Sequence, residues 1–400
     1  MPIKLLFDME QLSIAGTKGT GVVRIAKELL FKLANNPDID LYPLVTTKRG
    51  DVIKYLEYAN LTNLKDKIVY MTKLKNTTKS TSIKKRIKSK ISSFINFNKY
   101  NKQLSNFDAY FSIFSPISPI VYKSNIKTYM FIHDLIPIFH PEFCDAKFVT
   151  KYTSRMKDID ADTIFCNSEY TKQDLLKFRP DLISKNIDVA YLAADEKFQP
   201  ITDVKTLKNV KEKYNIKTDK YFLGVSELST RKNFIHLLQS YINFLRKTKA
   251  EDISLVLVGP IRKGFKDITK AINNFEEYKE KIICTGFADD QDMAPLYSGA
   301  LAFCYPSLYE GFGLPILEAM QCETPVISAD NSSLPEVGGD AVIYITGKDE
   351  EETSTKLTEI YTNKNLRENL SKKSQTQSQN FSWDKFNNQI CNVMIKEIKK

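Results

Sequence analysis

The chain has 400 residues, of which 42% are apolar, enough for two ordinary domains of about 200 residues each and too many for a disordered protein. No apolar run approaches the roughly 20 residues needed to cross a bilayer, and the first residues read as a strand rather than a signal peptide. Residues 73–102 hold ten basic residues and no acidic one, which accounts for the whole net charge of +10, so the rest of the chain is not a nucleic-acid-binding surface.

Strand-like and helical stretches alternate along the chain in two series, separated by a lysine-rich polar segment near residues 195–220. This alternation is typical of βαβ units and parallel sheets, and ligands of such sheets bind where strands end. In chain order, the first series contains predicted strands at Lys4–Met9, Ala109–Phe114, Thr128–His133, Thr163–Asn167 and Asp188–Leu192, with helices at Val22–Ala34 and Tyr170–Phe178. The second contains strands at Phe222–Ser226, Leu255–Gly259, Ile282–Gly286, Leu301–Tyr305, Val326–Ala329 and Val342–Ile345, with helices at Phe234–Lys247, Lys266–Tyr278, Asp290–Ser298 and Pro315–Gln321; the polar stretch Ser371–Asn380 is expected to be a helix end or a loop.

The loop after the first strand concentrates glycine. It contains Gly16, Gly19 and Gly21, three of the four glycines in the first 200 residues. Such a loop lets the backbone approach a ligand closely. Its spacing is neither a Walker A loop nor a full Gly-x-Gly-x-x-Gly, because residue 24 is arginine, and the loop alone does not specify a ligand.

A strand in the first half runs into His133 and Asp134. A histidine and an aspartate at a strand end are candidates for a polar contact or for acid/base chemistry, although a histidine with a purely structural role fits equally well. His140 and His236 show no metal-ligand spacing, and the six cysteines form no Cys-x-x-Cys pair. We therefore expect a reducing cytoplasm and no structural zinc.

In the second half, Arg231 and Lys232 stand between a strand and a helix. Cations near the N–H groups of a helix N-terminus suit a diphosphate, and the helix dipole makes this a poor place for purely structural cations. A phosphate-binding role is favoured over a solvated pair.

Two glutamates, Glu310 and Glu318, flank a glycine-proline turn after the strand that ends at Tyr305. A helix beginning near Pro315 would present the backbone N–H groups of Gly313 and Leu314 to a phosphate. Glu318, one turn into that helix, could reach ribose hydroxyls. From the spacing alone, two solvated glutamates beside a turn are an equally good interpretation.

Carboxylate pairs that could hold a metal-bound sugar nucleotide occur as Asp-x-Asp at residues 38–40, 158–162 and 290–292. The first two precede strands, at the wrong edge of a sheet, and Asp290 and Asp292 begin a helix, where aspartates serve as caps. A structural role is favoured for all three, with Asp290 and Asp292 left as the remaining metal candidates. No metal and no other cofactor is expected.

Together these motifs resemble the retaining family 4 glycosyltransferases of GT-B fold. The resemblance rests on Glu310-x7-Glu318, on Arg231-Lys232-Asn, and on Ser333-Leu-Pro-Glu-Val-Gly-Gly339, and covers roughly residues 220–345. Gly19-Thr-Gly21 and His133-Asp-Leu-Ile-Pro137 are similar to a subset that assembles bacterial polysaccharides such as O-antigen.

The resemblance implies two Rossmann-like doubly wound domains facing each other across a cleft. Residues 1–195 would bind the acceptor, residues 196–382 the nucleotide sugar, and a last helix, 383–400, would cross back to the first domain. Many relatives carry glycine within Tyr191–Asp195, where this chain has leucine and alanine, which leaves the hinge between the domains open.

The resemblance also implies the roles of the candidate residues. Arg231, Lys232, Gly313 and Leu314 would neutralise the diphosphate, Glu318 would hold the ribose, and Gly19 and Gly21 would approach the phosphates. The catalytic candidates are Glu310, which would contact the donor sugar, and His133 with Asp134, which would meet the donor sugar or the acceptor. The expected activity transfers a hexose or deoxyhexose, with GDP-mannose the favoured donor, to a lipid-linked or oligosaccharide acceptor.

Other interpretations remain. Another GT-B enzyme, such as a sugar-nucleotide epimerase or a phosphorylase, is one, and a nucleic-acid-binding protein that uses residues 73–102 is disfavoured because no RNA-binding module is recognisable. Within that segment, residues 83–97 combine an apolar stripe with lysines, a pattern that suits an anionic membrane surface and equally suits packing on the first domain. We expect a cytoplasmic protein at the inner face of the cell membrane that does not bind nucleic acid.

Overall fold

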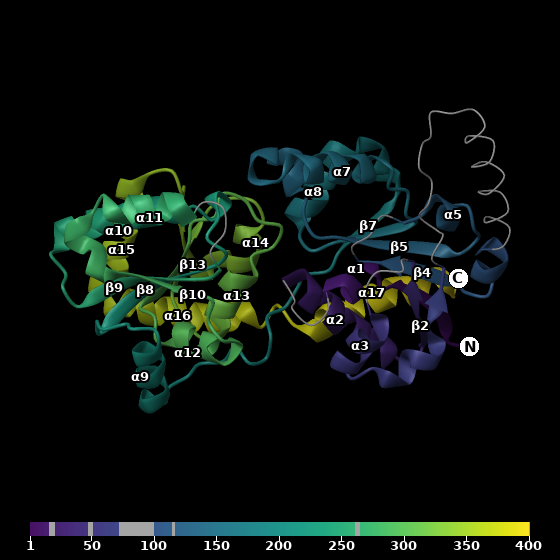
Figure 1. Ribbon diagram of the computed structural model, residues 1–400, viewed down its shortest axis with the longest axis horizontal. Coiled ribbons are helices and arrows are strands. Elements are labelled where there is room, and N and C mark those ends of the chain that lie inside the picture. Colours follow the sequence, from purple (N-terminus) through teal and green to yellow (C-terminus); the bar gives the residue numbers. More distant parts are fainter. Residues whose placement is uncertain (16–20, 47–50, 72–99, 114–116, 261–264, 400) are drawn as a thin grey trace. The chain divides into compact units, whose positions relative to one another are not determined.

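The computed structural model describes residues 1–15, 21–46, 51–71, 100–113, 117–260 and 265–399. They form two compact units: unit 1 is Met1–Tyr191 with Trp383–Lys400, and unit 2 is Leu192–Ser382. Each unit is built on one sheet, and all strand pairs in both sheets are parallel among the described residues (Figure 1). The predicted fold class, two Rossmann-like α/β units, is confirmed.

The sheet of unit 1 has seven strands in the order β3-β2-β1-β4-β5-β6-β7. Its central strands are short and apolar and are buried on both faces, as parallel strands covered by helices must be. The strands are β1 (Ile3–Asp8), β2 (Ile39–Val45), β3 (Val69–Tyr70), β4 (Ala109–Ser112), β5 (Lys127–Ile132), β6 (Thr163–Cys166) and β7 (Asn186–Val189).

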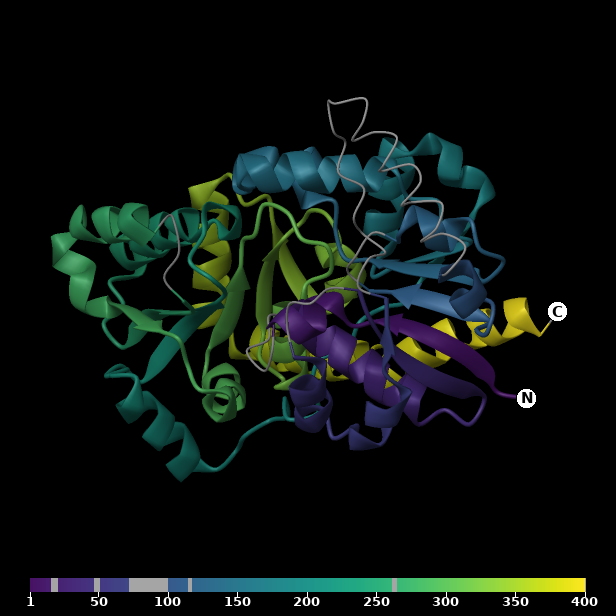
Figure 2. The same cartoon turned by 45° about the vertical axis from the view of Figure 1, so that its right-hand side comes forward.

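Helices cover both faces of this sheet, with α7 and α8 on one side and α2, α3 and α17 on the other (Figure 1). Figure 2 shows the C-terminal helix α17 lying beside α2, although the two helices are far apart in the sequence. Ser168 caps α8 as the sequence predicts, its hydroxyl accepting from the Thr171 N–H at 3.0 Å. The helices are α1 (Glu10–Ala15), α2 (Gly21–Ala34), α3 (Val52–Tyr58), α5 (Pro119–Tyr122), α6 (Ile136–Phe139), α7 (Ala146–Lys157), α8 (Glu169–Phe178) and α17 (Trp383–Ile398), with 3-10 turns η1 (Thr62–Lys67), η2 (Pro141–Phe143) and η3 (Pro180–Ser184).

The sheet of unit 2 has six strands in the order β10-β9-β8-β11-β12-β13. All six residues of β9 are buried, because this strand lies inside the sheet and both of its faces are covered. The strands are β8 (Lys220–Val225), β9 (Ile253–Val258), β10 (Ile282–Gly286), β11 (Ala302–Tyr305), β12 (Val326–Ala329) and β13 (Val342–Ile345).

In unit 2, α10, α11 and α15 lie on one face of the sheet, and α12, α13 and α16 lie on the other (Figure 1). The apolar face of α10 packs on β8 and β9 through side chains such as Leu237, Tyr241 and Phe244. The helices are α9 (Val204–Lys213), α10 (Phe234–Thr248), α11 (Phe265–Asn273), α12 (Met293–Ser298), α13 (Leu314–Gln321), α14 (Leu334–Gly338), α15 (Glu350–Thr362) and α16 (Lys364–Ser378), with 3-10 turns η4 (Thr230–Lys232), η5 (Glu276–Lys281), η6 (Asp290–Asp292) and η7 (Gly339–Ala341).

The order of the strands creates a switch point in unit 2. The chain leaves β8 toward β9 on one side and leaves β11 toward β12 on the other, while β8 and β11 are neighbours. The connections after β8 and β11 therefore diverge, which opens a crevice at the carboxyl ends of these two strands. The loops after β8 and β11 carry Arg231 and Lys232 and the stretch from Glu310 to Glu318.

Several elements differ from the prediction. The strand β2 was not predicted, because Pro43 interrupts its pattern; Pro43 pairs with Phe7 of β1, whereas the two-residue β3 pairs only with Leu44 and Val45. The predicted helix at residues 266–278 is two elements, α11 and η5. The polar stretch at residues 371–380 is the end of α16, which is helical through Ser378, as one of the two expectations for it had it. Within the described ranges, no helix is long and apolar enough to cross a membrane.

Candidate functional site

Arg231 and Lys232 lie in η4, the single turn between β8 and α10. Asn233 follows them in the left-handed conformation, with φ 57°, and its side-chain amide donates to the Gly347 carbonyl at 2.8 Å. Asn233 thus forms the junction between η4, which carries both cations, and α10. Lys232 is only 7% exposed, which is rare for a lysine and requires a partner.

That partner is Glu310, from the loop after β11. Its Oε1 accepts from Lys232 Nζ at 2.6 Å, from the Tyr305 hydroxyl at 2.9 Å and from Ser307 Oγ at 2.5 Å. Its Oε2 lies 2.7 Å from Arg231 Nη1. The structure thus brings together three of the predicted residues, Arg231, Lys232 and Glu310. Lys232 and Glu310 are 78 positions apart in the sequence.

The electrostatics of this cluster follow from its burial. Burial alone would raise the pKa of Glu310, but Lys232 and Arg231 outweigh it and lower the pKa to about 2. Burial lowers the pKa of Lys232, with Arg231 adding to the effect and Glu310 opposing it. Glu310 is therefore an anion at neutral pH and cannot serve as a proton donor.

Two serines hold the Glu310 loop by its backbone. Ser332 Oγ accepts from the Glu310 N–H at 3.0 Å, and Ser333 Oγ donates to the carbonyls of Glu310 and Phe312 at 3.1 and 2.8 Å. Sequence reasoning named Ser333 only within a motif and gave no role to Tyr305, Ser307 or Ser332. A local signal was present for Tyr305 and Ser307, which stand five and three positions before Glu310, whereas Ser332 and Ser333 lie 22 and 23 positions after it.

The turn after Glu310 leads into α13. Gly313 precedes the helix with φ 120°, and a Cβ there would meet Leu334 Cδ2 at 2.9 Å, so only glycine fits. No side chain caps the helix, which leaves the N–H groups of Gly313 and Leu314 at its start available to an anion. Glu318 lies one turn further on, buried, and accepts from the Tyr297 hydroxyl at 3.1 Å.

His133 and Asp134 follow β5 in unit 1. His133 Nε2 lies 2.9 Å from the Ile113 carbonyl oxygen, and burial of the ring lowers the pKa of His133 to about 4. Asp134 Oδ1 accepts from the Ile136 N–H at 3.0 Å and so holds the start of α6. The histidine is therefore neutral at physiological pH and can act there as a hydrogen-bonding group but not as a cation.

Some predicted features cannot be placed. Gly19 and the segments 83–97 and, for the most part, 73–102 lie outside the described residues. Gly21 is described and is the first residue of α2. The interpretations attached to the basic segment stay predictions.

The Asp-x-Asp residues of unit 2 take part in ion pairs on the surface. Lys197 lies 3.0 Å from Asp290, and Lys213 lies 2.5 Å from Asp292. The Tyr214 hydroxyl also donates to Asp292 at 2.7 Å. Across the part of the chain that the structure describes, no group of three or more histidine, cysteine, aspartate or glutamate residues is arranged to hold a metal ion.

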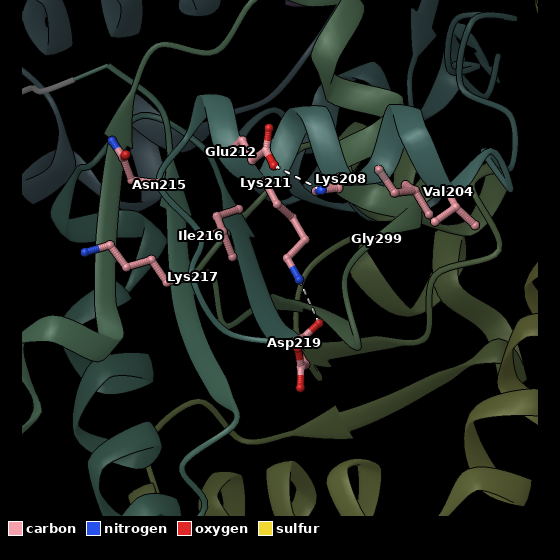
Figure 3. Close-up of a pocket in the computed structure, with 10 residues that line it drawn as sticks. Val204, Lys208, Lys211, Glu212, Asn215, Ile216, Lys217, Asp219 and Gly299 are labelled. Carbon is pink, nitrogen blue, oxygen red and sulfur yellow. Dashed lines mark hydrogen bonds and ion pairs between the residues drawn. The ribbon is translucent and has the colours of Figure 1, made fainter.

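A hollow of about 760 Å³ lies elsewhere on unit 2, between α9 and the start of β8 (Figure 3). Two of its lysines already have local partners: Lys208 lies 3.7 Å from Glu212, and Lys211 Nζ donates to the Asp219 carbonyl at 3.1 Å. It adjoins the amino end of β8, whereas Arg231, Lys232 and Glu310 follow the carboxyl ends of β8 and β11. The hollow is therefore separate from the candidate site.

Part of the chain matches a known protein family, and a larger part is similar to known enzymes. Residues 207–377 match the family described as glycosyl transferases group 1. Over 262 residues, or 64% of this chain, the sequence is 28% identical to the serotype-specific mannosyltransferase WbdA of Escherichia coli, but the match spans only 32% of that longer protein. It is 29% identical over 257 residues to the O-antigen chain mannosyltransferase B of Escherichia coli, covering 64% of this chain and 66% of the relative.

Solved structures match along the whole chain. A glycosyltransferase from Rickettsia africae aligns with a TM-score of 0.71 at 19% identity, covering 100% of this chain and 99% of the other. Anabaena HepE in complex with UDP aligns with a TM-score of 0.72 at 16% identity, covering 99% and 100%. At such identities the likeness establishes the fold, which is GT-B. The chain thus has the GT-B fold, its residues 207–377 match the glycosyl transferases group 1 family, and its sequence is similar to O-antigen mannosyltransferases.

Proposed function

We propose that this protein is a retaining glycosyltransferase that moves a hexose or deoxyhexose from a nucleotide sugar to a growing bacterial surface glycan. The observation that carries the proposal is the buried cluster of Arg231, Lys232 and Glu310 at the switch point of unit 2, in the same loop system as the uncapped start of α13. Two cations and a helix N-terminus are the groups that a diphosphate requires.

The roles follow from the chemistry of the donor. When the bond between sugar and phosphate breaks, negative charge develops on the diphosphate, and Arg231, Lys232 and the amides of Gly313 and Leu314 stabilise it. Glu318 holds the ribose, and Glu310 lies beside the donor sugar, next to Arg231 and Lys232. The acceptor hydroxyl attacks on the face of the leaving group and passes its proton to a phosphate oxygen, so the configuration is retained without a covalent intermediate.

The remaining assignments rest on the relatives and on the N-terminal motif. GDP-mannose is the favoured donor because mannosyltransferases are prominent among the relatives. The acceptor is a lipid-linked or oligosaccharide glycan, and His133 and Asp134 of unit 1 contact either the donor sugar or this acceptor. The protein then acts in the cytoplasm at the inner face of the membrane, with residues 83–97 as the candidate membrane contact.

The first experiment removes the two cations. In an Arg231→Ala/Lys232→Ala variant, the loss of charge-assisted contacts to phosphate should cost on the order of 2–4 kcal/mol of transition-state stabilisation, or about 30- to 1000-fold in turnover. Thermal-shift screening with GDP, UDP and dTDP sugars first identifies the donor, since a bound ligand raises the melting temperature. Release of nucleoside diphosphate then measures turnover.

A matched control removes two exposed lysines of unit 2, Lys205 and Lys208, by substitution with alanine. This variant has the same net charge as the first one and should keep normal turnover. Near-normal turnover in the Arg231→Ala/Lys232→Ala variant would show that the diphosphate is bound elsewhere.

A second experiment tests independence from metal ions. Because Arg231 and Lys232 supply the counter-charge, transfer should proceed unchanged in excess EDTA. Loss of transfer in EDTA that Mg²⁺ or Mn²⁺ restores would contradict this assignment. Asp290 and Asp292 would then be substituted first.

A further inference from the structure

The carboxylate of Glu310 is turned toward cations of its own unit. It receives four donors, from Lys232, Tyr305, Ser307 and Arg231, at 2.5–2.9 Å. A carboxylate offers about four lone-pair sites, so a sugar hydroxyl could bind Glu310 only in competition with these donors. The side chain is 10% exposed, which leaves little of it for a ligand to contact.

The backbone of Glu310 is held as firmly as its side chain. Ser332 accepts from its N–H, and Ser333 donates to its carbonyl. Turning the carboxylate toward a ligand would therefore break buried ion pairs or the hydrogen bonds that fix the loop. The first loss leaves buried charges unpaired and the second leaves buried polar groups without hydrogen bonds, and both are unfavourable.

We propose that Glu310 is a positioning residue, the built-in counter-ion of Arg231 and Lys232, that holds both cations in place and limits how tightly they retain the diphosphate product. This inference rests on the proposed function, because it takes Arg231 and Lys232 as the phosphate-binding groups. It replaces the expected contact between Glu310 and the donor sugar.

The charge balance of this buried cluster affects how tightly it holds an anion. Two cations alone would carry a charge of +2, whereas with Glu310 the cluster carries +1. A site that binds substrate, transition state and product too tightly gains nothing in turnover, because the product must leave. Glu310 keeps the cations aligned for the charge that develops during transfer while moderating their hold on the diphosphate.

Glu310 also keeps Lys232 protonated. The charged and titratable groups facing Lys232 are Glu310 and Tyr305 from β11 and its loop, Arg231 from its own turn, and Glu227 from the loop after β8. Burial and Arg231 lower the pKa of Lys232, and the two glutamates raise it. Without Glu310, Lys232 should lose its proton at lower pH, and phosphate binding should weaken sooner as the pH rises.

The test is a double-mutant cycle read out by calorimetric titration of the full chain with inorganic pyrophosphate. Glu310→Gln removes the counter-ion and should bind pyrophosphate on the order of tenfold more tightly than the wild type at pH 7, although its turnover falls. Lys232→Gln leaves one cation against one anion and should bind on the order of tenfold more weakly. The double variant Glu310→Gln/Lys232→Gln restores a charge of +1 and should bind about as tightly as the wild type.

The double variant removes both members of the buried pair, so it stays informative if Glu310→Gln alone does not fold. Glu368→Gln, on the exposed surface of α16, removes the same charge at a distance and should leave pyrophosphate affinity unchanged in 0.15 M salt. As a pH readout, Glu310→Gln should lose affinity at a lower alkaline pH than the wild type.

The outcomes separate this inference from the proposed function. If the wild type binds pyrophosphate but Glu310→Gln binds it equally or more weakly, and the double variant is as weak as Lys232→Gln, Glu310 is not a counter-ion and only this inference fails. If neither the wild type nor Glu310→Gln binds pyrophosphate, the phosphate site is wrong and the proposed function fails with it.

Discussion

At the scale of single residues, the buried charges of unit 2 are the clearest functional feature. Removing Lys232 and Glu310 from water is costly, and well-packed apolar residues could replace such a pair without loss of stability. Their presence beside Arg231 at a switch point therefore fits the proposed ligand-binding role better than a purely structural one. Burial lowers the pKa of His133, and the hydrogen bond between its ring and the Ile113 carbonyl raises that pKa only in part.

His133 gives a prediction about pH. Its pKa is lowered from 6.5 to about 4 in the folded protein, so between these values the unfolded chain binds more protons. The stabilisation by His133 is thus complete above pH 6.5 and is lost as the pH falls toward 4. In His133→Gln, whose side-chain amide can still donate to the Ile113 carbonyl, this loss should disappear.

Urea unfolding at pH 7.5 and pH 5 measures the effect. The stability of the wild type should fall more between the two values than that of His133→Gln, because all other titrating groups are common to both. An equal fall in the two proteins would show that His133 titrates at its ordinary pKa.

At the scale of elements, the start of α13 is set by backbone geometry. The chain must enter the helix through Gly313 at φ 120°, against Leu334 of α14. This close approach leaves the first N–H groups of α13 uncapped by side chains. The proposed anion binding at the start of this helix thus depends on one glycine.

Gly313→Ala should destabilise the protein. The conformation itself costs roughly 1–3 kcal/mol for a residue with a side chain, and the contact with Leu334 adds to it. Gly286→Ala is the matched control, because Gly286 also has a positive φ, of 70°, but a Cβ there meets nothing within 4 Å. Chemical denaturation should show the larger loss for Gly313→Ala, and pyrophosphate titration should show weaker binding in that variant alone; equal losses of stability would mean that the contact with Leu334 relaxes.

At the scale of the whole molecule, unit 1 is built from two separate stretches of the sequence, residues 1–191 and 383–400. The last helix, α17, belongs to unit 1 and buries Trp383, Phe386 and Ile390 there. Polar contacts fix its end, since Glu397 accepts from Thr163 at 2.9 Å and from Asn186 at 2.8 Å. Unit 1 therefore includes residues from two stretches that are separated by the whole of unit 2 in the sequence.

Ile390→Ala tests how much unit 1 depends on this helix. Ile390 is fully buried, so the change should cost about 2–5 kcal/mol of unfolding free energy through lost burial and a cavity. Asn392→Ala, at an exposed position two residues further on, should change it by less than about 0.5 kcal/mol. A small effect of Ile390→Ala in urea unfolding followed by hydrogen exchange in unit 1 would mean that α17 is only loosely attached.

The sequence by itself determined the class of fold and the chemistry of the candidate site. Buried parallel strands read as continuous apolar runs such as β9, and the alternation of strands and helices predicts parallel sheets. Strand ends could be located within a few residues, so Arg231, Lys232 and Glu310 could be named as charged residues that follow strand ends, and Glu318 as one in the helix after such an end. Elements without that pattern, such as β2 with Pro43, were missed.

Only the tertiary structure decided which of these residues meet. Sheet order makes β8 and β11 neighbours, and this pairing brings Lys232 to Glu310 across 78 positions. The same packing sends Asp290 and Asp292 to surface lysines and buries Tyr305 between Lys232 and Glu310. The physical reason is that local propensity acts over a few residues, whereas the charge state and the partners of a buried side chain depend on groups that the fold brings from far along the chain.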